Sequence, residues 1–360
     1  MKTFNLFLLF ILLCNVAFSQ EKKKNASFDF SSIEPFWHIV SVLQQDKEPS
    51  DQEWSALFST PGYKTLIERE LPEKWLKRYM TMGIMPSNKE EIQKWIEKKY
   101  SDVRFVLHFQ EVSSRKEEII LFIDEFRNKN DVKKTISMVE KFLPKGVSTN
   151  SIPTVSFIFF DKDARGYQPI LMDVLLAMDL CKDNLWNEVL AHEFHHFYRE
   201  SHISFNFPTD ESNDSRIIWF FNQIHLEGVA DMINKEKEFE RTPSSEMVIR
   251  YKKYLNEVPS DISKMDSLLS LYNKEPEKQK EINEEIEKSV KQSGHPMGFY
   301  MASSIQKYCS RKYVVKEIGN PFGFFYRYNE AAKKSKDKLP VFSDAAIATI
   351  NQLEAKYSKK

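Results

Sequence analysis

Residues 187–200 read Asn-Glu-Val-Leu-Ala-His-Glu-Phe-His-His-Phe-Tyr-Arg-Glu and contain the pattern His-Glu-x-x-His at His192, Glu193 and His196. Successive residues of a helix turn by about 100°, so His192 and His196 lie about 40° apart and can direct their rings at one metal ion. A zinc ion held by two histidines and a third protein ligand keeps an open position for water, and the adjacent glutamate can take the proton of that water. The stretch therefore predicts a zinc hydrolase site on a helix, with a peptidase as the working hypothesis.

The residues around this motif predict a largely buried helix. Its apolar surface is formed by Val189, Leu190, Phe194, Phe197 and Tyr198. A polar cluster on a buried helix is costly unless its members are satisfied, which favours a functional site over a chance string. His195 lies on the other flank, and as a ligand it would leave no glutamate in the required place. We therefore expect His195 to have a packing or supporting role.

Composition narrows the function classes. The 360 residues include 52 basic and 52 acidic side chains, so the formal net charge is zero. Such a balance gives no electrostatic reason to expect nucleic acid or an anionic membrane surface as a partner. At 41% hydrophobic residues, with 28 Phe, the chain can build a substantial core as one large domain or two closely joined ones.

Residues 1–19 have the composition of an export signal. One lysine precedes a short apolar run, and Ala17-Phe18-Ser19 offers small residues where a signal peptidase cleaves. The run is short for a membrane span, so we favour cleavage near Ser19 over a retained anchor. Because no later stretch approaches transmembrane length, we expect a protein without stable membrane insertion, periplasmic or extracellular.

Cysteine usage argues against thiolate chemistry. Cys14 falls in the signal, which leaves Cys181 and Cys309. They could form one disulfide or remain as two buried thiols. No Cys-x-x-Cys spacing occurs, so neither a thiolate zinc site nor a dithiol redox centre is expected.

The apolar pattern divides the chain into a helical N-terminal region, residues 20–148, and a catalytic region, residues 149–360, which could also form one continuous domain. Residues 154–160, Thr-Val-Ser-Phe-Ile-Phe-Phe, predict a strand, and residues 169–176 a second strand antiparallel to it. The exposed edge of the first strand could hold an extended peptide, or the strand could simply pack against the zinc helix.

A second helix, starting near Ser212, carries Leu226-Glu227-Gly228-Val229-Ala230-Asp231, and its Glu and Asp share one helix face. His-Glu-x-x-His followed by Glu-x-x-x-Asp on a second helix resembles the gluzincins, the thermolysin-like zinc metallopeptidases. The resemblance implies a zinc ion held by His192, His196 and Glu227. It also implies Glu193 as general base and Asp231 as the residue that orients a ligand histidine. The alternative is an ordinary Glu/Asp pair on a helix surface.

The order of segments also resembles uncharacterised bacterial zinc-dependent peptidases, over roughly residues 28–332. The third histidine of the metzincins is missing after His196, and the β-rich N-terminal part of the thermolysins is absent. Substrate range therefore does not carry over from either group.

A peptidase also needs a hydrogen-bond donor for the oxyanion of its tetrahedral intermediate. Tyr300 and His295, beside the turn at residues 294–298, are the candidates, with Tyr300 preferred. Their simpler roles would be a core residue and a turn residue.

We therefore predict an α+β, mainly α, zincin-like fold with a small antiparallel sheet and helical N- and C-terminal regions. The predicted activity is zinc-dependent hydrolysis of peptide or protein substrates. Two other readings remain open, namely an exported zinc-binding or interaction protein without catalysis and a zinc amidase that is not a peptidase.

Overall fold

The computed structural model describes residues 27–128, 131–208 and 212–359. The predicted export signal at residues 1–19, with Cys14, lies outside these described residues. Within them, no helix combines the length and the apolar character needed to cross a membrane.

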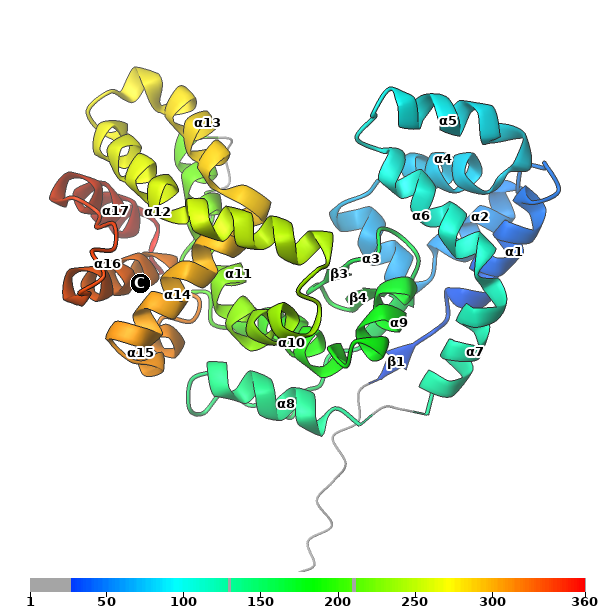
Figure 1. Ribbon diagram of the computed structural model, residues 1–360, viewed down its shortest axis with the longest axis horizontal. Coiled ribbons are helices and arrows are strands. Elements are labelled where there is room, and N and C mark those ends of the chain that lie inside the picture. Colours follow the sequence, from blue (N-terminus) through cyan, green and yellow to red (C-terminus); the bar gives the residue numbers. More distant parts are fainter. Residues whose placement is uncertain (1–26, 129–130, 209–211, 360) are drawn as a thin grey trace, which may run out of the picture.

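Helices dominate the N-terminal part, as the apolar periodicity predicts, and those up to residue 126 form the blue-to-cyan side of the molecule in Figure 1. The elements are β1 (Phe28–Asp29), α1 (Ile33–Leu43), α2 (Asp51–Phe58), α3 (Pro61–Arg69), α4 (Glu73–Ile84), α5 (Lys89–Glu97), α6 (Val103–Ser114), α7 (Lys116–Phe126) and α8 (Lys133–Val139). Short 3-10 turns are η1 (Pro86–Asn88) and η2 (Glu140–Phe142).

A four-stranded mixed sheet follows, in the order β1-β2-β4-β3. Its later strands are β2 (Val155–Ile158), β3 (Ala164–Arg165) and β4 (Ile170–Asp173). The α+β, mainly α, class is confirmed, but the antiparallel pairing predicted for the two longer strands is wrong. β2 is parallel to both β1 and β4, and only the two-residue strand β3 runs antiparallel to β4.

The reason for this error lies between the two strands. Residues 161–166, for which the sequence predicts no strand, contain β3, which reverses the chain before β4 begins. β4 is also shorter than predicted, because helix α9 begins at Val174. The near-continuous apolar run of β2 is typical of a parallel strand covered on both faces, and all four of its residues are buried.

Alternation of side chains along β2 explains how the sheet is covered. The Phe157 ring packs against Phe126 of α7 and Trp186 at the start of α10. On the opposite face, Gly62 of α3 lies so close to Ile158 that a Cβ at this glycine would fall 2.5 Å from the isoleucine side chain. The sheet therefore joins the N-terminal helices to α10.

The remaining helices are coloured green to red in Figure 1. They are α9 (Val174–Lys182), α10 (Trp186–Glu200), α11 (Asn213–Arg241), α12 (Glu246–Tyr272), α13 (Gln279–Ser289), α14 (His295–Tyr308), α15 (Arg311–Lys316), α16 (Pro321–Lys334) and α17 (Asp344–Tyr357), with 3-10 turns η3 (Pro276–Lys278) and η4 (Lys291–Gly294). The long helix α11 packs against both α10 and α14.

The buried hydrophobic side chains of both predicted regions belong to one cluster, and α8 packs directly on α10. The division at residues 148 and 149 stays a prediction. The thiols of Cys181, on α9, and Cys309, directly after α14, are not joined to each other in a disulfide.

A buried ion pair links the N-terminal helices to the sheet. His108 Nε2, on α6, lies 3.0 Å from Asp173 Oδ2 at the end of β4, and both side chains are buried. Burial alone would lower the pKa of His108, but the charge and hydrogen bond of Asp173 outweigh it and raise that pKa.

His108→Gln is expected to make stability less dependent on pH. The folded pKa of His108 is raised, so its contribution is complete below the unfolded value of about 6.5 and is lost as pH rises through the folded pKa. The free energy of unfolding of the wild type should therefore exceed that of the variant most at pH 5.5 and least at pH 8.5, as measured by urea unfolding. His38→Gln removes an exposed histidine as the control. Parallel pH curves for wild type and His108→Gln would rule out the linkage.

Candidate metal centre

Helices α10 and α11 bring the three predicted ligands together. His192 and His196 lie one turn apart on α10, and their Nε2 atoms are 3.4 Å and 3.3 Å from Oε2 of Glu227 on α11. Ser212 caps the start of α11 by accepting a hydrogen bond from the Ser215 N–H. The two imidazoles thus converge on one carboxylate oxygen.

These separations fit a zinc ion. Ligand atoms bonded to tetrahedral zinc at about 2.0–2.1 Å stand about 3.3 Å apart, which matches the distances to Glu227 Oε2. Two imidazoles and a carboxylate also form a donor set that zinc commonly takes. The residues present therefore fit a zinc ion.

His295 adds a third imidazole to the cluster. Its Nε2 lies 3.3 Å from Glu227 Oε2, and ligand-type atoms of His192, Glu227 and His295 all lie within 4.8 Å of one another. The side chain of His295 is 27% exposed, against 7% for His192 and 12% for Glu227. The centre is therefore most open on its His295 side.

The approach of α14 to α11 depends on three glycines. Gly294 caps the start of α14 with φ of +91°, a left-handed conformation that suits glycine. A Cβ on Gly228 would fall 2.2 Å from the carbonyl carbon of Gly298. This close contact brings the first residue of α14, His295, to Glu227.

The outer nitrogens of His192 and His295 lie against polar groups, whereas Nδ1 of His196 is buried without a hydrogen-bond partner among the described residues. His192 Nδ1 lies 3.1 Å from Asn234 Oδ1 and 3.5 Å from Asp231 Oδ1. Asp231 Oδ2 is 2.9 Å from His295 Nδ1 and accepts a hydrogen bond from the Tyr251 hydroxyl at 2.7 Å. Asp231 thus lies close to both His192 and His295. Asn234 and Asp231 both face the same nitrogen of His192, Nδ1.

Burial and nearby charges raise the pKa of some residues at this centre and lower the pKa of others. Burial raises the pKa of the Glu193 carboxyl, which is 7% exposed. Burial would lower the pKa of His192, but its hydrogen bond to Glu227 and the charges of nearby carboxylates raise that pKa to about 9. Burial would raise the pKa of Glu227, but the surrounding histidines hold it well below its usual range. Glu227 is therefore held as an ionised carboxylate between the imidazoles.

Two other candidates lie apart from this cluster. Tyr300, on the same helix as His295, packs beside Tyr328, and the two ring centroids are 6.3 Å apart. Burial raises the pKa of Tyr300, and the charges of Tyr308 and Asp337 raise it further. His195 is fully buried on α10, and burial with the charges of His196 and Arg199 lowers its pKa well below 6.5. The described contacts of Tyr300 thus lead away from the metal ligands.

Strand β3 lies beside the metal centre as an edge of the sheet. A Cβ on Gly166, the residue after β3, would fall 2.6 Å from Cβ of His196. The strand predicted to offer a substrate edge, residues 154–160, instead contains β2, which lies inside the sheet between β1 and β4. The backbone of Ala164 already bonds the side chains of Asp163 and Arg165, so this part of the edge is not open for strand addition.

Sequence reasoning missed Asn234, Tyr251 and the position of β3. Asn234 follows Glu227 by seven residues, nearly two helical turns, so its spacing places it on the same face and could have revealed it. Tyr251 lies on a separate helix, α12, and no local pattern connects it to the motif.

Residues 54–337 match the family model described as "Putative zinc dependent peptidase (DUF5700)". The matched range covers most of the chain and includes all residues of the cluster described above. No significant match is found among curated proteins or among solved structures.

Proposed function

Since the chain belongs to the family described as "Putative zinc dependent peptidase (DUF5700)", we propose that it hydrolyses peptide bonds with a zinc ion held by His192, His196 and Glu227. The observation that carries the proposal is the spacing of the two imidazole nitrogens from Glu227 Oε2, 3.4 Å and 3.3 Å. Zinc in such a site supplies Lewis acidity, which acidifies a water molecule and polarises a carbonyl group.

Glu193 acts as the general base in this proposal. It precedes His196 by three residues on α10, borders the ligand face and is largely buried. Burial raises the pKa of its carboxyl, which brings it closer to a value useful for proton transfer near neutral pH. Glu193 removes the proton from the attacking water and then gives it to the departing amine, so one carboxylate serves both halves of the hydrolysis.

His295 is the proposed oxyanion donor, ahead of Tyr300. Asp231 Oδ2, 2.9 Å from His295 Nδ1, orients the ring so that Nε2 faces Glu227. As an imidazolium, stabilised by this aspartate, His295 donates from Nε2 to the developing oxyanion. A role for Tyr300 stays a prediction.

The same geometry supports one alternative. A neutral His295 with its proton on Nδ1 presents a lone pair at Nε2, which suits a fourth metal ligand. A zinc ion closed in by four protein ligands is typical of a structural site, so the protein would then bind zinc without catalysis.

Glu227→Ala is expected to lose most of its zinc, because it removes the carboxylate on which the imidazoles converge. His295→Ala is the paired variant, and the proposal expects it to keep zinc and to hydrolyse peptides more slowly. Metal content after dialysis, measured by mass spectrometry on both purified variants, distinguishes the two roles. Full zinc content in Glu227→Ala would remove Glu227 from the site, and zinc loss in His295→Ala would favour the non-catalytic alternative.

The overall test combines metal analysis with cleavage of a random peptide library, with and without a chelator. The proposal expects zinc near one equivalent and cleavage that the chelator abolishes. A protein that holds zinc but cleaves only non-peptide amides would be the amidase considered from the sequence. We also propose that the protein acts after export, on the composition of residues 1–19.

A further inference from the structure

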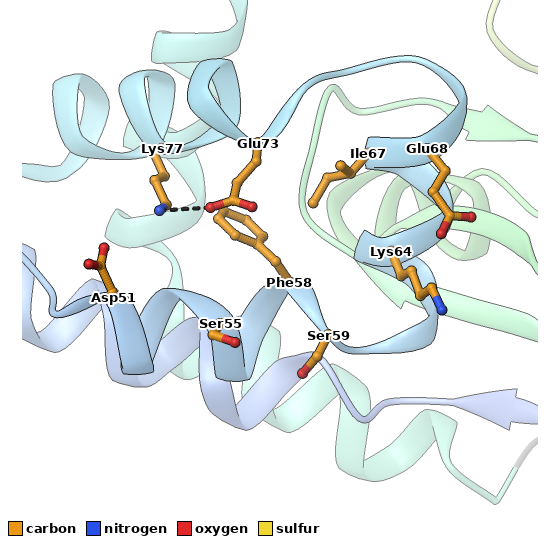
Figure 2. Close-up of a pocket in the computed structure, with 9 residues that line it drawn as sticks. All are labelled: Asp51, Ser55, Phe58, Ser59, Lys64, Ile67, Glu68, Glu73 and Lys77. Carbon is orange, nitrogen blue, oxygen red and sulfur yellow. Dashed lines mark ion pairs between the residues drawn. The ribbon is translucent and has the colours of Figure 1, made fainter.

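Two cavities differ in their relation to the metal centre. The larger, about 480 Å³, is lined entirely by residues 51–77 of the N-terminal helices, and Figure 2 shows its mixed acidic and basic walls. The smaller, about 340 Å³, is lined in part by Phe197, the residue after His196. Only the smaller cavity includes a residue of the helix that carries the His-Glu-x-x-His motif.

A turn of the chain also connects the smaller cavity with the metal centre. Gln168 and Pro169 line the cavity, and Gly166 two residues earlier packs against the side chain of His196. Residues 166–169 therefore run from the side chain of His196 to the lining of the cavity. A peptide bound beside His196 can place a neighbouring side chain there. Its volume is within the range of ligand pockets in proteins, about 300–1,000 Å³.

The lining of this cavity has a distinct chemistry. Its apolar members are Pro61, Ile152, Pro153, Pro169 and Phe197. Asp29, at the end of β1, is the one ionisable residue among the lining residues. Its Oδ1 accepts a hydrogen bond from the Ser31 N–H at 3.0 Å, and its Oδ2 accepts one from the Ser156 hydroxyl at 2.9 Å. These bonds fix the carboxylate, and no basic side chain of the lining neutralises it.

The neutral polar members are Ser151, Thr154 and Gln168. A cavity with five apolar residues, these neutral polar ones and one fixed carboxylate suits a long side chain that has an apolar stem and a cationic end. Lysine and arginine bury their methylene groups along apolar surface while the charged end reaches a polar partner. A hydrogen bond between such a cation and a carboxylate is stronger than one between neutral groups. An acidic side chain would instead meet the Asp29 charge.

We propose that this cavity receives a lysine or arginine side chain of the substrate, close to the scissile bond, and that Asp29 determines this preference. The inference rests on the peptidase function proposed above. It names the substrate class of that site as peptides with a basic residue at one fixed position relative to the cleaved bond.

The test compares kcat/KM for peptide pairs that differ only by arginine or norleucine at each position around the bond. The wild type should prefer arginine at one position, and Asp29→Asn should reduce that preference by about tenfold to a hundredfold, mainly through KM. The Asn side chain keeps the size of Asp and can still accept from the Ser31 N–H. Ile152→Trp, which fills the cavity from another wall, should reduce the same preference.

Glu68→Gln is the matched control, because it neutralises a carboxylate of the larger cavity (Figure 2) and should leave the arginine preference unchanged. Cleavage by the wild type without a basic preference would overturn this inference and leave the peptidase proposal standing, as would a preference that survives both Asp29→Asn and Ile152→Trp. A zinc-loaded wild type that cleaves no peptide would overturn both.

Discussion

Glu193→Gln is expected to retain zinc and to lose peptide hydrolysis by a factor of about 10²–10⁴. Glutamine has nearly the same shape but cannot take a proton from water, so the variant removes the base and leaves the proposed ligands unchanged. Glu193 is 7% exposed, and its near-isosteric replacement leaves little space unfilled. The measurements are zinc content by mass spectrometry and kcat on a cleaved peptide.

Glu200→Gln provides the matched control, since it makes the same chemical change at an exposed residue of the same helix. It should keep both zinc and activity. A Glu193→Gln protein with full zinc and full kcat would show that another group removes the proton.

Among the substitutions proposed for this protein, Gly228→Ala is expected to lower the free energy of unfolding most. The added Cβ would fall 2.2 Å from the carbonyl carbon of Gly298, and backbone cannot yield as a flexible side chain does. Helices α11 and α14 must therefore move apart, at a cost typical of overpacking, about 1–3 kcal/mol or more. Because α14 begins with His295, the same movement should lower peptide hydrolysis. Urea unfolding and kcat together measure both effects.

Gly146→Ala separates close contact from the general effect of replacing a glycine. Gly146 has φ of +96°, and a Cβ there would meet nothing within 4 Å. It should cost only the strain of a left-handed alanine, about 1–2 kcal/mol, with unchanged activity. If Gly228→Ala unfolds no more readily than wild type, the two helices are not held by this contact.

The elements that the sequence predicts well are those with a long local pattern. The helical N-terminal part and the helix after Ser212 follow from apolar periodicity and capping residues, and the structure contains both. Helix α12 continues through Pro259, although the sequence predicts that a helix ends there. Proline usually ends a helix, so the local signal there was misleading.

The sheet was harder to predict because strand pairing joins segments that are distant in sequence. The near-continuous apolar run of residues 154–160 is typical of a buried parallel strand, but it does not identify which segment pairs with it. The two-residue strand β3 is too short to have an apolar period, yet it reverses the chain and forms the edge beside His196. The direction of β4 relative to β2 and the edge of the sheet beside His196 both depend on β3.

The candidate site also contains residues that local spacing predicts and residues that only long-range packing brings together. By itself, the sequence determined that His192, Glu193 and His196 share one side of a helix and that Glu227 and Asp231 share a face of another, because spacing within a helix is fixed by local geometry. Only the tertiary structure decided that His295 reaches the same carboxylate and that Asp29 lines a cavity together with Phe197, the residue after His196. These residues belong to separate elements, and their meeting depends on how closely helices and strands pack, down to the contact between two glycines.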